Sequence, residues 1–322
     1  MIGKRLAGLL MVCISVRCWH PTGHFLTALI AKKEIEKADA DLIPYLESVL
    51  KLLGLYTKEA SYPFIESAEF PDDIKFLNWK SFDSWHFNDI YIYMPDAPNK
   101  NLPQNPQNVV WAINESHETL SNQKTSEVNI FFGKSFMLRY LIHLVGDIHQ
   151  PLHNTSLVSS VFPDGDAGGN NFAIDYHSVH DLHTLWDVCL KQYEEVRAPL
   201  TDANMQYLDD AATAIMTEFT RDALKDKLAD VSPTGWSNES QQIAQDFVYA
   251  KINVNDTPTD EYITDGFVIV KQQLALGGYR LADLLLKIFT PDNRKPVSFQ
   301  VEKRPAEAAE NGRANKIQVE TD

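Results

Sequence analysis

Apolar residues recur at intervals of three or four through most of the chain, which predicts a protein built mainly of helices. A strongly apolar stretch runs from about Asn129 to His149. The other predicted helices lie at residues 19–36, 39–53, 109–120, 182–193, 202–229, 236–252 and 262–289. The connections between them are short, so we expect a single domain in which these helices form a bundle.

Two regions depart from the helical pattern. Residues 94–108 are rich in proline and asparagine and are predicted to form a loop. Residues 163–171 are rich in glycine and lead into the alternating run Phe172–Tyr176, which predicts one strand of a hairpin. The predicted fold is therefore mostly α, a single-domain helical bundle with a short β-hairpin.

The two ends of the chain are expected to lie outside this domain. Lys4 and Arg5 precede an apolar run that is too short to span a bilayer, as in a signal peptide. We expect residues 1–18 to be removed, leaving 19–290 as the folded domain; an uncleaved anchor is the alternative. Residues 291–322 are charged and poor in large apolar side chains, which predicts a disordered tail.

A cleaved signal peptide predicts a protein that is secreted or enters an endomembrane or lysosomal lumen. No other segment is long and apolar enough to cross a membrane. We expect the protein to be a monomer. Cys189 would be the one cysteine of the mature chain, so no disulfide can form within it. Four sequons permit N-glycosylation, at Asn114, Asn154, Asn238 and Asn255.

The formal net charge of −15 argues against a protein that grips nucleic acid with a basic surface. It does not exclude a metal-centred site, because bound cations reverse the local field of a pocket. An acidic protein can therefore still act on phosphate esters if it holds the cations itself.

The helix predicted at 129–149 carries polar residues in an otherwise apolar pattern. His143 and Asp147 are four apart, which places their Cβ atoms about 5–6 Å from each other on one face. Gly146 is expected to leave open space beside that face, and His153 follows in the next turn. An imidazole and a carboxylate are costly to bury unpaired, and a divalent metal would satisfy both. A buried polar network is the alternative interpretation.

A second pair with the same spacing, His183 and Asp187, lies on another predicted helix. If the leader is cut before Trp19, the new terminal amine and carbonyl oxygen can chelate a metal together with His24. Imidazole nitrogen and carboxylate oxygen are common zinc ligands. The candidate side-chain ligands are His24, Asp72, His86, His143, Asp147, His153, His183 and Asp187.

Around these ligands lie longer motifs: Phe70-Pro71-Asp72-Asp73-Ile74, Trp85-His86-Phe87-Asn88-Asp89, His143-x-x-x-Asp147-x-His149-Gln150-Pro151-Leu152-His153, Gly168-Gly169-Asn170, Leu182-His183-x-x-Trp186-Asp187, Trp236-x-x-Glu239-Ser240 and Gly277-Gly278-Tyr279-Arg280-Leu281-Ala282. With Trp19 and His24, they resemble the class I nucleases of the nuclease S–nuclease P type, from Trp19 to about Phe289. Zinc-dependent phospholipase C is a more distant relative with the same metal core, so the resemblance implies a phospholipase C/nuclease P-like fold. Departures at His20, Phe70, Pro71 and Asn88 remove no ligand.

The resemblance implies three zinc ions per chain. The first would be held by Asp72, His86, His143 and Asp147. The second would be held by His153, His183 and Asp187. The third would take the amine and carbonyl of Trp19, with His24 and Asp147, whose carboxylate bridges two metals.

The resemblance also implies a zinc-dependent endonuclease that hydrolyses single-stranded RNA and DNA to 5′-phosphate products and acts as a 3′-nucleotidase. Asp72 would orient the attacking water and Lys75 would pair with the phosphate. Phe87 would stack on a base, Asp89 would accept hydrogen bonds from it, and Asn170 is a further candidate contact.

His149 has no metal role in this scheme and is expected to donate a hydrogen bond behind the ligands. Two other functions stay open from the sequence. One is a zinc-dependent phospholipase C-like hydrolase, and the other is a secreted binding protein with structural zinc.

Overall fold

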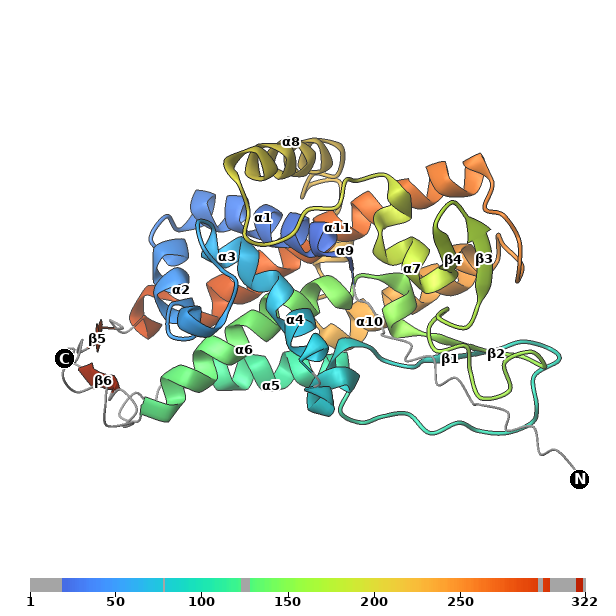
Figure 1. The fold of residues 1–322 in the computed structure, drawn as a ribbon, viewed down its shortest axis with the longest axis horizontal. Helices are drawn as coiled ribbons and strands as arrows, with labels where there is room; N and C mark the ends of the chain where they lie inside the picture. The colour runs from blue at the N-terminus through green and yellow to red at the C-terminus, as the bar shows by residue number, and fades with distance from the viewer. Residues whose placement is uncertain (1–18, 78, 123–127, 295–297, 302–316, 321–322) are drawn as a thin grey trace, which may run out of the picture.

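The computed structural model describes residues 19–77, 79–122, 128–294, 298–301 and 317–320 (Figure 1). Most of them are helical, which confirms the mostly α prediction. The predicted signal peptide, residues 1–18, lies outside the described residues. Within the described part of the chain, no helix combines the length and apolar character needed to cross a bilayer.

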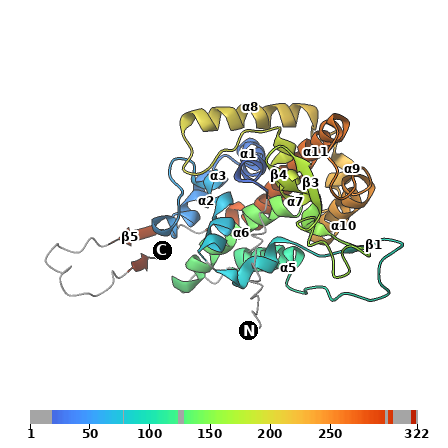
Figure 2. The same cartoon turned by 45° about the vertical axis from the view of Figure 1, so that its right-hand side comes forward.

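Three long helices form the centre of the domain: α1 (Pro21–Ala38), α6 (Val128–Asp147) and α11 (Asp260–Ile288). α1 packs along α11, and both contact α6. The approach of α1 to α11 is close because Gly278 has no side chain: a Cβ there would lie 2.4 Å from Ile30 Cγ2. α5 (Val109–Ser121) pairs with α6, whereas α8 (Asp202–Glu218) covers α1 on the outer side (Figures 1 and 2).

Shorter elements complete the helical part. They are α2 (Leu42–Leu50), η1 (Gly54–Tyr56), α3 (Pro63–Glu66), η2 (Ser67–Glu69), α4 (Phe70–Phe76), η3 (Lys80–His86), η4 (Pro151–Asn154), α7 (Leu182–Asp187), η5 (Cys189–Lys191), α9 (Lys225–Leu228), α10 (Pro233–Ile243), η6 (Ala244–Val248) and η7 (Pro291–Asn293). Several of these short elements end at or contain a candidate ligand, so side chains far apart in sequence are brought to one place.

The helix predicted at 182–193 ends early. α7 stops at Asp187, and Cys189, Leu190 and Lys191 have φ values of 51°, 55° and 60°. Three consecutive residues in the left-handed region cannot continue a right-handed helix. The chain therefore turns back towards the start of α1, where His20 N donates to Asp187 O at 2.9 Å.

The strands are short. β3 (Ala173–Tyr176) and β4 (Val179–Asp181) pair antiparallel, which confirms the predicted hairpin. β1 (Tyr91–Tyr93) pairs parallel with β2 (Ser156–Val158), with Tyr91 opposite Ser156, and sequence periodicity did not predict this pair.

Part of the predicted C-terminal tail is also paired. β5 (Ser298–Val301) and β6 (Ile317–Glu320) form an antiparallel ribbon, where a disordered tail was expected. Polar and apolar residues alternate in both segments, which is the pattern of a strand. The residues that join them lie outside the described part of the chain.

Candidate metal centre

The last turns of α6 form the wall of the candidate site. His143 and Asp147 are both fully buried, and His143 Nε2 lies 3.0 Å from Asp147 Oδ2. The i, i+4 spacing therefore places both side chains on one face, as predicted. The space expected beside Gly146 is not open, because His24 from α1 occupies it.

One group of ligand atoms surrounds Asp147 Oδ2. His86, at the end of η3, places Nδ1 2.9 Å from this oxygen and 3.0 Å from His143 Nε2. Asp72, on α4, places Oδ1 3.9 Å from His86 Nδ1 and 3.8 Å from His143 Nε2. Asp72, His86 and His143 together offer ligand atoms that all lie within 4.8 Å of one another.

A second group lies where η4 meets α7. His153 Nε2 is 3.5 Å from Asp187 Oδ1, and His183 Nε2 is 3.3 Å from Asp187 Oδ2. The two imidazole rings stack with centroids 4.9 Å apart. His153 Nδ1 also lies 3.6 Å from Asp147 Oδ1, so this group adjoins the first.

A third group joins α1 to α6. His24 Nε2 lies 3.4 Å from Asp147 Oδ1, and the His24 ring stacks on His143 with centroids 3.8 Å apart. The indole of Trp19 is fully buried and donates from Nε1 to Gly146 O at 2.9 Å. Trp19 is thereby attached to the last turn of α6, beside Asp147.

Backbone carbonyls orient three of the imidazoles. Nδ1 of His143 lies 2.6 Å from Ala68 O, Nδ1 of His153 lies 2.8 Å from His86 O, and Nδ1 of His183 lies 2.6 Å from Gly168 O. A carbonyl oxygen can only accept, so each Nδ1 carries the proton. Each Nε2 is therefore left with a lone pair directed at the carboxylates, which is how histidines are commonly presented to a metal.

Several buried polar atoms of the site have no hydrogen-bond partner among the described residues. They are both ring nitrogens of His24, Asp147 Oδ1, His153 Nε2 and Asp187 Oδ2. Buried polar atoms are normally satisfied, because leaving one unpaired costs about 1–3 kcal/mol. Cations held by the three groups would pair with Asp147 Oδ1, His153 Nε2, Asp187 Oδ2 and one ring nitrogen of His24, and these nitrogen and oxygen donors are those that zinc takes.

The pKa values of most candidate ligands favour the metal-binding forms. His143 is the exception: burial lowers its pKa, but the carboxylates of Asp147 and Asp72 outweigh this and raise it. Burial lowers the pKa of His24 and of His86 to about 3, so both imidazoles are neutral at pH 7. Burial opposes ionisation of Asp147, but the neighbouring His143 and His153 hold the pKa of its carboxyl well below the usual range. Burial likewise opposes ionisation of Asp187, and His183 and His153 lower its pKa. Neutral imidazole and ionised carboxylate are the forms that bind metals.

Sequence reasoning missed Gln150. Its Nε2 donates to Asp187 Oδ1 at 2.7 Å, while its Oε1 accepts from Leu152 N at 2.6 Å. Both ends of the amide are thus fixed, and the amide holds one oxygen of Asp187 in place. Periodicity gives no signal for this role, and only its place between two ligand histidines marks the residue.

The candidate substrate residues lie next to ligands in the chain. Lys75 Nζ is 3.0 Å from Asp72 Oδ1. Phe87 and Asp89 directly follow His86 and are both partly buried. Burial raises the pKa of Asp89 to about 6, and the carboxylate of Asp166 adds to the shift. Asn170 instead donates from Nδ2 to Ala167 O at 2.7 Å, within its own loop.

His149 lies apart from the ligands. Its Nδ1 donates to Val145 O at 2.7 Å, and its Nε2 accepts from Arg280 at 2.8 Å. Burial, reinforced by the Arg280 charge, holds the pKa of His149 well below its usual range. His149 thus donates to a backbone carbonyl and not to a candidate ligand, where a donor behind the ligands was expected. Its two contacts join α6 to α11.

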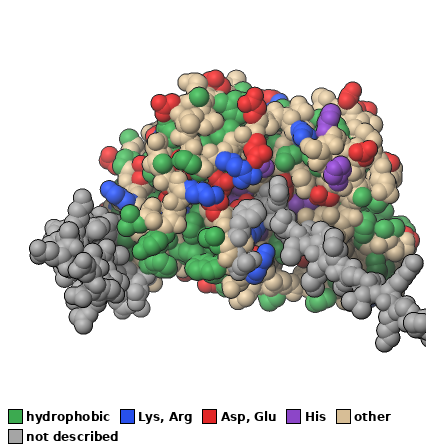
Figure 3. Space-filling model, viewed as in Figure 1, with side chains coloured by type: hydrophobic (Ala, Val, Ile, Leu, Met, Phe, Trp, Pro, Cys, Tyr) green, Lys and Arg blue, Asp and Glu red, His purple; other side chains and the backbone are tan. Residues whose placement is uncertain are grey.

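The surface agrees with the acidic composition. On the face shown in Figure 3, acidic and basic side chains are interspersed and no continuous basic stripe is visible.

Known proteins resemble this chain over most of its length. The sequence model of the S1/P1 nuclease family matches residues 19–290. Endonuclease 4 of Arabidopsis thaliana is 26% identical over 290 residues, which cover 85% of this chain and 90% of that protein. Endonuclease 2 of the same plant is 27% identical over 294 residues, covering 87% and 94%. Nuclease P1 of Penicillium citrinum is 26% identical over 163 residues, covering 47% and 57%.

The family match runs from before α1 to the end of α11 and includes every residue of the three His/Asp groups. A match over this much of the chain is decisive for the family. The chain therefore belongs to the S1/P1 nuclease family, and it is a hydrolase that acts on the ester bonds of nucleic acids.

Proposed function

We propose that this nuclease is a three-zinc phosphodiesterase that cleaves single-stranded RNA and DNA internally. The observation that carries the proposal is the sharing of one carboxylate. Asp147 Oδ2 contacts His86 and His143, while Asp147 Oδ1 faces Nε2 of His24. A carboxylate with imidazoles on both oxygens is suited to bridge two cations.

The three His/Asp groups support one ligand set each. Asp72, His86, His143 and Asp147 would hold the first zinc. His153, His183 and Asp187 would hold the second. His24, Asp147 and the terminal amine and carbonyl of Trp19 would hold the third, once residues 1–18 have been removed.

Zinc bound here would supply a hydroxide from water near neutral pH and would neutralise charge on the phosphate. The remaining work belongs to the protein side chains. Asp72 orients the attacking water, and Lys75, held against Asp72 at 3.0 Å, pairs with a phosphate oxygen. In-line attack of water on phosphorus would break the P–O3′ bond, so that the 3′ oxygen leaves as a hydroxyl and the phosphate stays on the 5′ oxygen. The same site would remove a terminal 3′ phosphate.

The preference for single strands would come from the segment after His86. Phe87 offers a ring on which a base can stack, an interaction worth about 1–3 kcal/mol and largely independent of sequence. Asp89 would accept hydrogen bonds from that base. A duplex cannot present an unstacked base to these two residues, so it is expected to be a poor substrate.

The same proposal places the protein outside the cell. Removal of residues 1–18 during secretion would create the Trp19 amine that the third zinc needs. Removal of the signal peptide and binding of the third zinc would thus be coupled. We propose that the protein is secreted, rather than kept in an endomembrane or lysosomal lumen. Membership of the nuclease family favours this function over the phospholipase C-like alternative.

An end-group analysis tests the proposal. The mature protein is freed of metal with a chelator, reconstituted with zinc, and given a single-stranded oligonucleotide and its duplex. We expect zinc-dependent cleavage of the single strand with 5′-phosphate ends, and lipid vesicles should stay intact. Products with 3′-phosphate ends, or equal activity in the metal-free protein, would overturn it.

A further inference from the structure

The start of α1 is held by a segment that follows α7. We call residues 194–198 the strap. The hydroxyl of Thr22 donates to Glu194 O at 2.8 Å and accepts from Val196 N at 2.9 Å. The Thr22 hydroxyl, near the start of the predicted mature chain, is thus bonded to the strap backbone at two residues, Glu194 and Val196.

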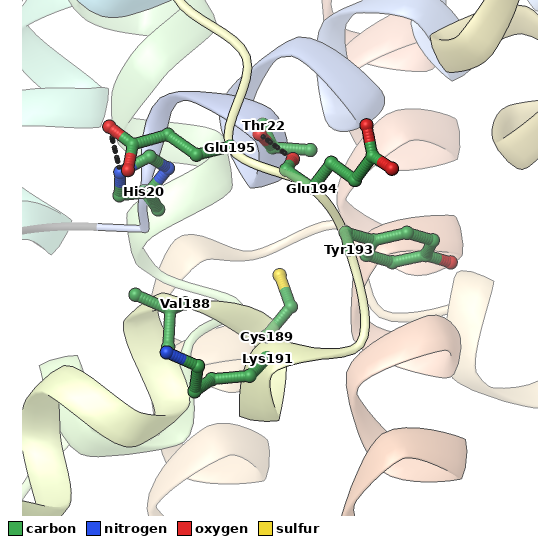
Figure 4. Close-up of a pocket in the computed structure, with 8 residues that line it drawn as sticks. All are labelled: His20, Thr22, Val188, Cys189, Lys191, Tyr193, Glu194 and Glu195. Atoms are coloured by element: carbon green, nitrogen blue, oxygen red, sulfur yellow. Dashed lines mark hydrogen bonds and ion pairs between the residues drawn. The ribbon is translucent and has the colours of Figure 1, made fainter. Parts of the chain in front are cut away.

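Side chains of the strap hold His20, the residue after Trp19. His20 Nε2 lies 2.8 Å from Glu195 Oε1, and the His20 side chain is only 10% exposed. Arg197 donates from Nε to the same carboxylate oxygen at 2.6 Å. Figure 4 shows the His20–Glu195 contact and the Thr22–Glu194 contact side by side at the rim of a cavity of about 170 Å³.

The strap continues to the segment that carries Asp72. Arg197 Nη1 lies 3.3 Å from Glu69 Oε1, and Glu69 Oε2 accepts from Ala198 N at 3.0 Å. Glu69 directly precedes α4. Polar contacts therefore run without a break from His20 through the strap to the helix of Asp72.

The left-handed turn after α7 explains how the strap reaches this place. Cys189, Leu190 and Lys191 reverse the chain directly after Asp187, and Leu190 packs where Gly266 leaves room, since a Cβ there would lie 2.7 Å from Leu190 Cδ1. Figure 4 shows this turn on one side of the cavity and the strap on the other.

We propose that the strap is a clamp for the mature N-terminus, with Glu195 as a positioning residue. Chain termini are usually poorly ordered unless they are tied down. Here Trp19 Nε1 bonds to Gly146 O, His20 N bonds to Asp187 O, and Glu195 fixes the His20 ring. The clamp holds the Trp19 backbone beside His24, which is where the third zinc needs it. The inference rests on the proposed metal arrangement.

Three variants of the mature protein test the clamp. Glu195→Ala removes the contact to His20, and Glu195→Gln keeps a hydrogen-bonding group of the same length. Glu194→Ala is the matched control, because Glu194 is exposed and its bond to Thr22 uses the backbone carbonyl. The measurements are zinc content and the rate of zinc release to a coloured chelator, after mass spectrometry has verified that the chain begins at Trp19.

We expect Glu195→Ala to release one of three zinc ions at least ~10-fold faster, as is typical when a group that orients a ligand is lost. The other two ions should leave at the wild-type rate. For the ion that leaves faster, the release rate of Glu195→Gln should lie between those of wild type and Glu195→Ala, and the rate of Glu194→Ala should match the wild type. Equal release from Glu195→Ala and wild type would overturn the clamp. A wild type with no third zinc would instead overturn the proposed metal arrangement.

Hydrogen exchange on the zinc-free proteins separates these failures. The clamp predicts that the peptide containing the His20 amide exchanges about tenfold faster in Glu195→Ala than in Glu194→Ala. Equal exchange in the two variants would overturn the clamp whatever the zinc content.

Discussion

His24 of α1 packs directly against Gly146 of α6, and it can do so only because glycine has no side chain: a Cβ on Gly146 would lie 2.7 Å from His24 Nδ1. We expect Gly146→Ala to push His24 out of line with Asp147 and to lower zinc content by one ion per chain. The clash with His24 should also lower the free energy of unfolding. Helix propensity alone predicts the opposite, because alanine stabilises a helix by up to about 1 kcal/mol relative to glycine. Zinc analysis together with urea unfolding checks both parts.

The same helix supplies the control for this variant. A Cβ on Gly133 would meet its nearest neighbour, Thr119 Cγ2, at 4.0 Å, which is ordinary contact. Gly133→Ala should therefore keep all its zinc and gain about 0.5–1 kcal/mol of stability. If Gly146→Ala behaved like Gly133→Ala, His24 would not depend on the space at Gly146.

Gln150→Leu should weaken the zinc held by His153, His183 and Asp187. The amide of Gln150 fixes Asp187 Oδ1 at 2.7 Å, and loss of such a group typically costs 10–100-fold in metal affinity. Competition with a chelator of known affinity measures the loss. Gln206→Leu on the surface of α8 is the control and should bind zinc as the wild type does. Equal affinities in the two variants would contradict the role of Gln150.

Asp89 should make stability depend on pH. Burial raises its pKa from 3.8 to about 6, so the native state binds this proton more tightly than the unfolded chain. The wild type therefore loses stability as pH rises from about 4 to about 6, and the full penalty is present above pH 6. Asp89→Asn removes the titration.

The gain in the free energy of unfolding of Asp89→Asn over wild type should accordingly grow between pH 4 and 6 and then level off. The pKa shift sets an upper limit of about 3 kcal/mol, and solvent contact reduces the expected gain to about 1 kcal/mol. Urea unfolding at pH 4.5, 5.5 and 7.5 measures it. A difference that is the same at all three pH values would contradict the assignment.

Asn154 should carry no glycan although it lies in a sequon. It is fully buried, and its Nδ2 donates to Ile148 O and Gln150 O at 2.9 and 3.0 Å. Those bonds brace the turn that leads from α6 to His153. Asn114, Asn238 and Asn255 are exposed. Peptide mapping of protein made in a glycosylating host, after enzymatic deglycosylation, should find Asn154 unmodified, and an active protein with a glycan there would contradict the structure.

Periodicity alone predicts most of the long helices well, but the helix expected at 202–229 is broken: α8 ends at Glu218 and α9 begins at Lys225. α1, α2, α5, α6 and α11 begin and end within about three residues of the predicted bounds, because each buries an apolar stripe. The parallel pair of β1 and β2 escaped prediction, since three-residue strands that are far apart in sequence leave no local pattern. The end of α7 escaped because left-handed φ values at Cys189, Leu190 and Lys191 are unexpected for residues that are not glycine.

The sequence predicts the candidate ligands of the site, but not the residues that hold those ligands in place. Spacing alone marks the pairs His143–Asp147 and His183–Asp187 as candidate ligands, while their grouping into three zinc sites is implied only by the resemblance to the nuclease family. Gln150 and Glu195 act through contacts that join distant segments. Such contacts become visible only when the fold brings α6, α7 and the strap together.

Zinc stoichiometry of the mature protein and of its Asp147→Ala variant tests the central claim most directly. With a verified N-terminus at Trp19, elemental analysis should find three zinc ions per chain in the wild type. Asp147→Ala should retain one, because the carboxylate that we propose as a shared ligand of the other two would be lost. Three zinc ions retained in Asp147→Ala, or fewer than three in the wild type, would contradict the account.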